Sequence, residues 1–128
     1  MRLLLDTHAF PWFITADAKL SQVAEQAIRD VTNTPLLSIA SGWEIAIKVT
    51  RGRLPLPQPL DQFIPHHLQS DQIAVLPIEL QHAYGLVRLP LHHRDPFDRL
   101  LISQALSEDI PIVSTDSVFD AYPVKRLW

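Results

Sequence analysis

Four acidic residues stand where short apolar runs of the chain meet helical patterns, and this placement could bring their carboxylates together. Asp6 directly follows the run 3–5, and Asp116 stands two residues after Ser114, which ends another run. Glu44 lies in the first turns of a helix that leaves a third run, whereas Asp98 lies in the first turn of a helix that precedes a strand. Ligands of open α/β sheets bind beyond the carboxyl ends of the strands, where Asp6, Glu44 and Asp116 are expected to meet. That Asp98 also lies at this edge is an inference, because its position follows less directly from the order of strands and helices.

Such a group of carboxylates predicts a divalent metal site. Three or four carboxylates at one edge of a sheet repel one another unless a cation neutralises them. Hard oxygen ligands select Mg²⁺ or Mn²⁺ over softer metals. One or two such ions polarise a phosphate group and lower the pKa of a bound water molecule. The expected reaction is therefore hydrolysis of a phosphodiester bond.

The elements that must position these acids alternate between strand and helix. The apolar runs are short and do not alternate with polar residues, which is typical of buried parallel strands. Ser21 and Ser41 are interpreted as helix N-caps, and Asp95 as the start of the strongest helix. Gly52 is interpreted as the end of a helix, and Pro65 is expected to disturb a short helix. The pattern predicts a three-layer α/β/α domain with a mainly parallel sheet of four or five strands. Strands are expected at 2–5, 36–39, 73–76, 111–114 and, as a fifth, 124–128.

Composition and charge restrict what these elements can build. The 128 residues fit one domain, 1–128, and 47% hydrophobic residues suffice for an ordinary core. A formal net charge of −3 gives no general attraction for nucleic acid, so any contact with RNA must be local. The lack of cysteine excludes disulfides, thiol nucleophiles and cysteine-based zinc sites. No apolar run approaches about 20 residues, so we expect no membrane span and a cytoplasmic location.

The chain resembles the PIN-domain ribonucleases of the VapC toxin family in four segments: LLLDTHAFPWF, SIASGWEIAIK, LPLHHRDPFDRLLISQAL and PIVSTDSVFDAY. The resemblance covers nearly the whole chain, and HHRDPFDRLLISQA is its specific part. It implies a Mg²⁺- or Mn²⁺-dependent endoribonuclease whose metal-binding and catalytic acids are Asp6, Glu44, Asp98 and Asp116. It also implies a cognate antitoxin as partner, and a homodimer that offers a hydrophobic groove to an antitoxin segment.

Each acid also has a structural interpretation. Asp6 could cap the helix that follows it, and Glu44 could be an acid favoured by a helix dipole. Asp95 reads as an N-cap with Asp98 at the third helical position, a variant of the capping box. We assign capping to Asp95 and metal binding to Asp98. Asp116 could be a turn residue, but a single cap or turn does not explain four matching acids.

Polar residues beside the four acids could assist them. Thr7 and Thr115 flank the strand ends and could orient a water molecule or a phosphate oxygen, although turn and cap hydroxyls are common there. Arg99 could contact substrate phosphate. Asp120 is either a turn residue or an outer-shell group. Further hydrogen-bond donors near the acids are His92, His93 and Arg94. A second basic cluster comprises Lys48, Arg51 and Arg53. It is interpreted equally well as an RNA-binding group or as cations at the end of a helix.

Two other functions stay open on the residues alone. An aspartyl-phosphate phosphotransferase also uses an Asp after the first strand of an α/β sheet. Here Asp6 is followed by Thr7 and His8 rather than by a second acid two residues on, which disfavours that enzyme class. A non-catalytic α/β protein-interaction module would use the acids as caps and its apolar helices for a partner. Aromatic residues left exposed on the early helices would mark such an interface.

Overall fold

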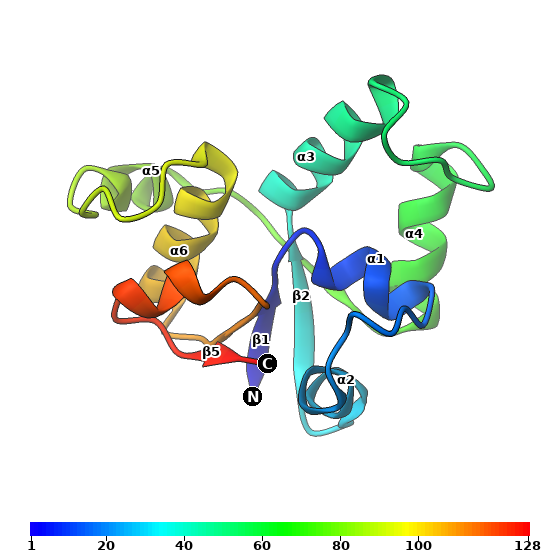
Figure 1. Cartoon of the computed structure of the whole chain (residues 1–128), viewed down its shortest axis with the longest axis horizontal. Coiled ribbons are helices and arrows are strands. Elements are labelled where there is room, and N and C mark those ends of the chain that lie inside the picture. Colours follow the sequence, from blue (N-terminus) through cyan, green and yellow to red (C-terminus); the bar gives the residue numbers. More distant parts are fainter.

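The computed structural model describes residues 1–128 as a five-stranded sheet with helices on both faces (Figure 1). All strands are parallel, in the order β3-β2-β1-β4-β5, so the expected three-layer architecture and the fifth strand are confirmed. The strands are β1 (Arg2–Leu5), β2 (Thr34–Ser38), β3 (Ala74–Leu76), β4 (Ile112–Val113) and β5 (Arg126–Leu127). The helices are α1 (Ala9–Ile14), α2 (Gln22–Arg29), α3 (Ile39–Thr50), α4 (Leu60–Ser70), α5 (Leu80–Leu86), α6 (Pro96–Glu108) and the 3₁₀ helix η1 (Ser117–Ala121).

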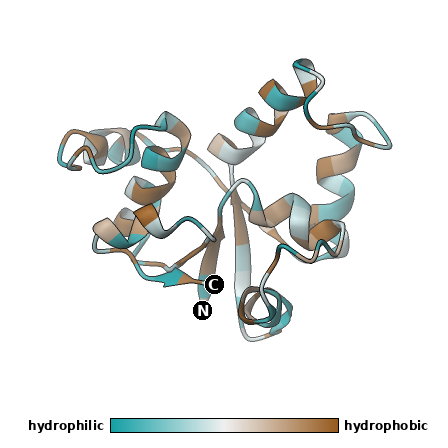
Figure 2. Ribbon diagram, viewed as in Figure 1, coloured by the Kyte–Doolittle hydropathy of each residue, from teal (hydrophilic) through white to brown (hydrophobic).

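The central strand β1 is buried on both faces, which explains its unbroken apolar run. Leu3 and Leu5 belong to a core that includes Phe10 of α1, whereas Leu4 belongs to a second core that includes Leu101 of α6. All three leucines are fully buried. Figure 2 shows β1 as hydrophobic over most of its length, as burial between two helical layers requires.

The order of the strands creates a crevice at the carboxyl edge of the sheet. The chain passes from β1 to β2 and β3 on one side, then returns to place β4 and β5 on the other. Leu5 therefore pairs with Leu37 of β2 and with Val113 of β4. Where neighbouring connections diverge in this way, open α/β sheets bind their ligands. Asp6 and Asp116 follow the two strands that border this crevice.

Helix α3 begins earlier than the sequence pattern indicated. Ser38 is the N-cap, since its Oγ accepts a hydrogen bond from the Ala40 N–H at 3.0 Å. Ser41, the expected cap, lies inside the helix, where its buried Oγ accepts a hydrogen bond from Thr7 Oγ1 at 3.1 Å. Ser38 also donates to Gln104 Oε1 at 2.6 Å, so a buried polar contact links the start of α3 to α6. The two serines give similar capping signals in the sequence, whereas in the structure each makes a different tertiary contact, Ser38 with Gln104 and Ser41 with Thr7.

Two other helix boundaries test the expectations. Gly52 follows the end of α3 with a φ of 67°, which confirms it as the helix stop. Pro65 lies inside α4, which continues through it to Ser70, so the expected disturbance does not end that helix. None of the helices combines the length and the apolar character that crossing a bilayer requires.

Candidate metal centre

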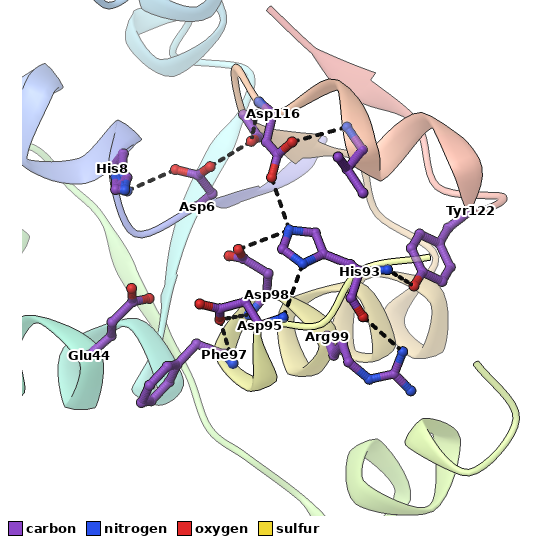
Figure 3. Close-up of polar contacts among 12 residues, drawn as sticks. Asp6, His8, Glu44, His93, Asp95, Phe97, Asp98, Arg99, Asp116 and Tyr122 are labelled. Atoms are coloured by element: carbon purple, nitrogen blue, oxygen red, sulfur yellow. Dashed lines mark hydrogen bonds and ion pairs between the residues drawn. The ribbon is translucent and has the colours of Figure 1, made fainter. Parts of the chain in front are cut away.

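The four expected acids line one cavity of about 200 Å³ at the carboxyl edge of the sheet. Asp6 and Asp116 reach it from the ends of β1 and β4, and Glu44 reaches it from α3 (Figure 3). Asp98 joins them because α6 leads into a parallel strand: such a helix runs back along the sheet, so its first turn lies at the carboxyl edge. The cavity is also lined by Thr7, His8, Asp95 and Thr115.

Asp6 is held by both of its carboxylate oxygens. Oδ1 accepts hydrogen bonds from the backbone N–H groups of His8 at 2.8 Å and Ala9 at 2.9 Å. This oxygen therefore bonds to backbone N–H groups at the start of α1, as a capping residue would. Oδ2 accepts a hydrogen bond from Ser114 Oγ, which ties the ends of β1 and β4 together. Carboxylate oxygens have more than one lone pair, so these bonds orient Asp6 and leave it able to bind a cation.

His93 bridges two of the acids. Its Nε2 lies 2.9 Å from Asp116 Oδ2 and 3.1 Å from Asp98 Oδ2. Its Nδ1 accepts the Asp95 N–H at 3.2 Å, which assigns the ring proton to Nε2. His93 therefore donates to both carboxylates and offsets their repulsion, rather than offering a lone pair to a metal. The sequence analysis expected His93 as a donor near the acids, but not as the residue that bridges Asp98 and Asp116.

Asp95 and Asp98 make different contacts, and only the role expected of Asp95 is tested by them. Asp95 Oδ1 accepts hydrogen bonds from the backbone N–H groups of Phe97 at 2.9 Å and Asp98 at 3.0 Å, which confirms Asp95 as the N-cap of α6. Asp98 does not complete a capping box, because His93 Nδ1 takes the Asp95 N–H. The carboxylate of Asp98 therefore faces the cavity, together with Asp6 and Asp116 (Figure 3).

Glu44 has a buried carboxylate oxygen without a partner. Its Oε1 makes no hydrogen bond, while Oε2 lies 3.5 Å from Lys48 Nζ one helical turn on. A buried oxygen of a charged group is costly to leave unsatisfied. Because Glu44 lines the cavity with four other acidic residues, a hard cation is the ligand that would satisfy this oxygen. The donor set therefore fits Mg²⁺ or Mn²⁺.

The electrostatics of the cavity raise the pKa of Asp98 to about 7. Burial is the main cause, followed by the negative charge of Asp95; the charges of Asp6 and Glu44 add to it, and His93 opposes it. The raised pKa shows that Asp6, Glu44 and Asp95 direct their negative charges at the carboxyl group of Asp98. A bound cation would reverse the balance by stabilising the ionised form.

We expect the stability of the metal-free protein to fall as pH rises from about 4 to about 7. In this window folded Asp98 retains a proton that the unfolded chain has lost, so the free energy of unfolding decreases with pH. The Asp98 side chain is 23% exposed, and solvent screening limits the loss to about 1–3 kcal/mol. Urea unfolding in EDTA should show this loss in the wild type and not in Asp98→Asn. If the free energy of unfolding depends on pH in the same way in both proteins, protonation of Asp98 is not the cause of the loss.

Three of the assisting residues expected from the sequence are engaged elsewhere. Asp120 forms an ion pair with Arg126, with both oxygens at 2.9 Å from guanidinium nitrogens, and does not line the cavity. The Arg99 guanidinium donates hydrogen bonds to four backbone carbonyls. The Thr7 hydroxyl is buried against Ser41. Thr115 alone of the predicted hydroxyl groups is exposed at the rim of the cavity.

Comparison with protein families gives a match over almost the whole chain. Residues 3–125 match the family model described as the PIN domain. Ribonuclease VapC16 of Mycobacterium tuberculosis is 39% identical over 57 residues, which are 44% of this chain. The aligned stretch spans only 39% of the length of that relative.

Three solved structures resemble the fold. VapBC2 from Rickettsia felis, bound to a DNA fragment from their promoter, gives a TM-score of 0.75 at 14% identity, with 100% of both chains covered. VapBC-1 from nontypeable Haemophilus influenzae gives 0.68 at 16% identity, covering 98% of this chain and 96% of that one. FitAcB from Neisseria gonorrhoeae gives 0.58 at 17% identity, covering 97% and 95%. At these identities the likeness concerns the fold alone.

Proposed function

The chain belongs to the PIN domain family, and on that premise we propose that its acid cavity is the active site of a metal-dependent endoribonuclease. The observation that carries the proposal is the convergence of four carboxylates on one cavity, with an oxygen of Glu44 that no protein group satisfies. Capping accounts for single oxygens of Asp6 and Asp116. It does not account for Glu44 and Asp98, which turn their carboxylates into the cavity.

Asp6, Glu44, Asp98 and Asp116 are the residues that would hold Mg²⁺ or Mn²⁺. Such an ion supplies positive charge for the phosphate and lowers the pKa of the attacking water molecule. Ser114 and the backbone N–H groups after Asp6 orient the first of these carboxylates. His93 orients Asp98 and Asp116 with the proton on its Nε2. Thr115 offers an exposed hydroxyl to a phosphate oxygen at the rim.

We further propose that the protein is the toxin of a toxin–antitoxin pair and forms a homodimer. An apolar groove of about 740 Å³ lies between α3, α4 and β3, and Trp43, which lines it, is 61% exposed. Exposed apolar surface of this kind marks protein interfaces. The resemblance to VapC toxins, together with the VapBC and FitAcB structures that share the fold, supports a cognate antitoxin as the partner. We propose a cytoplasmic location, because that is where an RNA substrate would be met.

The proposed activity is tested by cleavage of total cellular RNA with antitoxin-free protein. We expect discrete fragments with Mg²⁺ or Mn²⁺ and none in EDTA, because the four carboxylates repel a phosphate unless a cation neutralises them. The fragment ends identify the nucleophile. Ends without a 2′,3′-cyclic phosphate are expected for attack by water. Cleavage that persists in EDTA, or the absence of cleavage with either metal, would contradict the proposal.

A further inference from the structure

A second cavity adjoins the acid cavity and has no role in the function proposed above. Its volume is about 370 Å³, and it lies between α1, the end of α3 and the turn that follows α3. Thr7 and His8 line both cavities, so the two share a wall.

One wall of the second cavity is aromatic. The rings of His8 and Trp12 are stacked, with centroids 5.6 Å apart and planes at 25°. His8 is exposed, while Trp12 is half-buried and packs against Trp128. Aromatic side chains fixed in this way bind nucleobases by stacking, largely independently of base identity. Lys19 Nζ lies over the Trp12 ring, 5.8 Å from its centroid, so the exposed His8 ring is the part of this wall that suits an unpaired base.

The second cavity is also lined by two cations. Lys48 and Arg53 line it, whereas Arg51, the third member of that basic cluster, does not. Arg53 is exposed and has no ion-pair partner, and Lys48 is 3.5 Å from Glu44. Asp17 also lines the cavity, and its Oδ1 accepts the Lys19 N–H at 2.9 Å. Of these two cations only Arg53 is without an ion-pair partner, and both adjoin an acid cavity that would repel a phosphate.

We propose that the second cavity is a subsite for a nucleotide of single-stranded RNA adjacent to the scissile phosphate. The base packs against the His8–Trp12 wall, and the phosphate lies beside Lys48 and Arg53. This subsite rests on the proposed ribonuclease function and adds the residues that hold the substrate outside the reacting centre. It explains how a chain of net charge −3 retains RNA locally.

Binding of a random-sequence single-stranded RNA decamer tests the subsite. The protein carries Asp98→Asn, so that RNA is bound in Mg²⁺ without being cut, and affinity is measured by fluorescence anisotropy over a series of salt concentrations. Arg53→Gln should weaken binding about threefold to tenfold and reduce the salt slope by about 0.7, the value for one phosphate contact on a single strand. His8→Ala should weaken binding similarly with an unchanged slope, because stacking does not release counterions.

Arg88→Gln is the matched control, because Arg88 is an exposed arginine beyond the end of α5 that lines neither cavity. It should leave affinity and slope unchanged. If protein with Asp98 intact cleaves RNA while Arg53→Gln and His8→Ala bind it as tightly as the parent, the subsite is wrong and the ribonuclease function stands. If the Asp98→Asn parent does not bind RNA and the protein with Asp98 intact does not cleave it, both are wrong.

Discussion

Replacing Asp98 by Asn is expected to lower the rate of RNA cleavage by more than about a hundredfold while the protein stays folded. Substituting a residue that only orients a metal ligand costs about 10–100-fold, so loss of a ligand charge should cost more. The amide is nearly the same size as the carboxyl, and the N-cap bonds of α6 belong to Asp95. Cleavage under single-turnover conditions and the circular dichroism spectrum measure the two effects.

Asp120→Asn is the control for this substitution. Asp120 is also an acid at the carboxyl edge, but it is paired with Arg126 and lies outside the cavity. Its replacement should leave cleavage within about twofold of the wild type, since surface substitutions away from the site have small effects. Cleavage by Asp98→Asn at the wild-type rate would remove Asp98 from the metal centre.

Replacing Arg99 by Ala is expected to lower the free energy of unfolding by about 2–4 kcal/mol, because several charge-assisted hydrogen bonds are lost together. Arg99 Nη1 donates to the carbonyls of Pro90 at 2.9 Å and His93 at 3.3 Å. Nη2 donates to the carbonyls of Leu86 at 3.3 Å and Leu89 at 3.4 Å. Urea unfolding measures the loss. Cleavage should fall as well, because the segment from Leu86 to His93 would no longer hold the imidazole against the acids.

This result would separate two roles for Arg99. A substrate contact predicts a raised KM with unchanged stability, whereas the four carbonyl contacts predict lost stability. Arg88→Ala, in the same segment but without side-chain hydrogen bonds, should change the free energy of unfolding by less than about 0.5 kcal/mol. Unchanged stability of Arg99→Ala would show that the carbonyl contacts contribute nothing.

The sequence could predict the arrangement of the acid cavity because each acid has a position defined by topology. Asp6 and Asp116 follow parallel strands, whose carboxyl ends share an edge. Asp98 stands in the first turn of α6, which begins at that edge, although the sequence analysis placed it there only by inference. Local patterns were sufficient for the Ser21 and Asp95 caps, whose side chains accept the backbone bonds expected of them. The strand pattern likewise predicted the parallel sheet.

Contacts between distant segments could not be predicted in the same way. The interpretation of Ser41 as a cap was wrong, since α3 begins earlier, with Ser38 as its N-cap. Ser38 also bonds to Gln104, 66 residues away, and no local pattern shows this contact. Arg99 was interpreted as a contact for substrate phosphate. No local pattern in the sequence shows that its guanidinium donates hydrogen bonds to loop carbonyls instead. The bridging place of His93 depends on the loop that carries it, which Arg99 and the Tyr122 hydroxyl hold in place.

Binding of Mn²⁺, followed by electron paramagnetic resonance, tests most directly whether the acid cavity is a metal centre. At about pH 8 Asp98 is ionised, and the wild-type protein should bind Mn²⁺ with an affinity at least about tenfold higher than that of Asp98→Asn. Asp120→Asn should bind Mn²⁺ as the wild type does. Equal Mn²⁺ affinity in all three proteins, or no binding by the wild type, would contradict the assignment of a metal centre to these four acids.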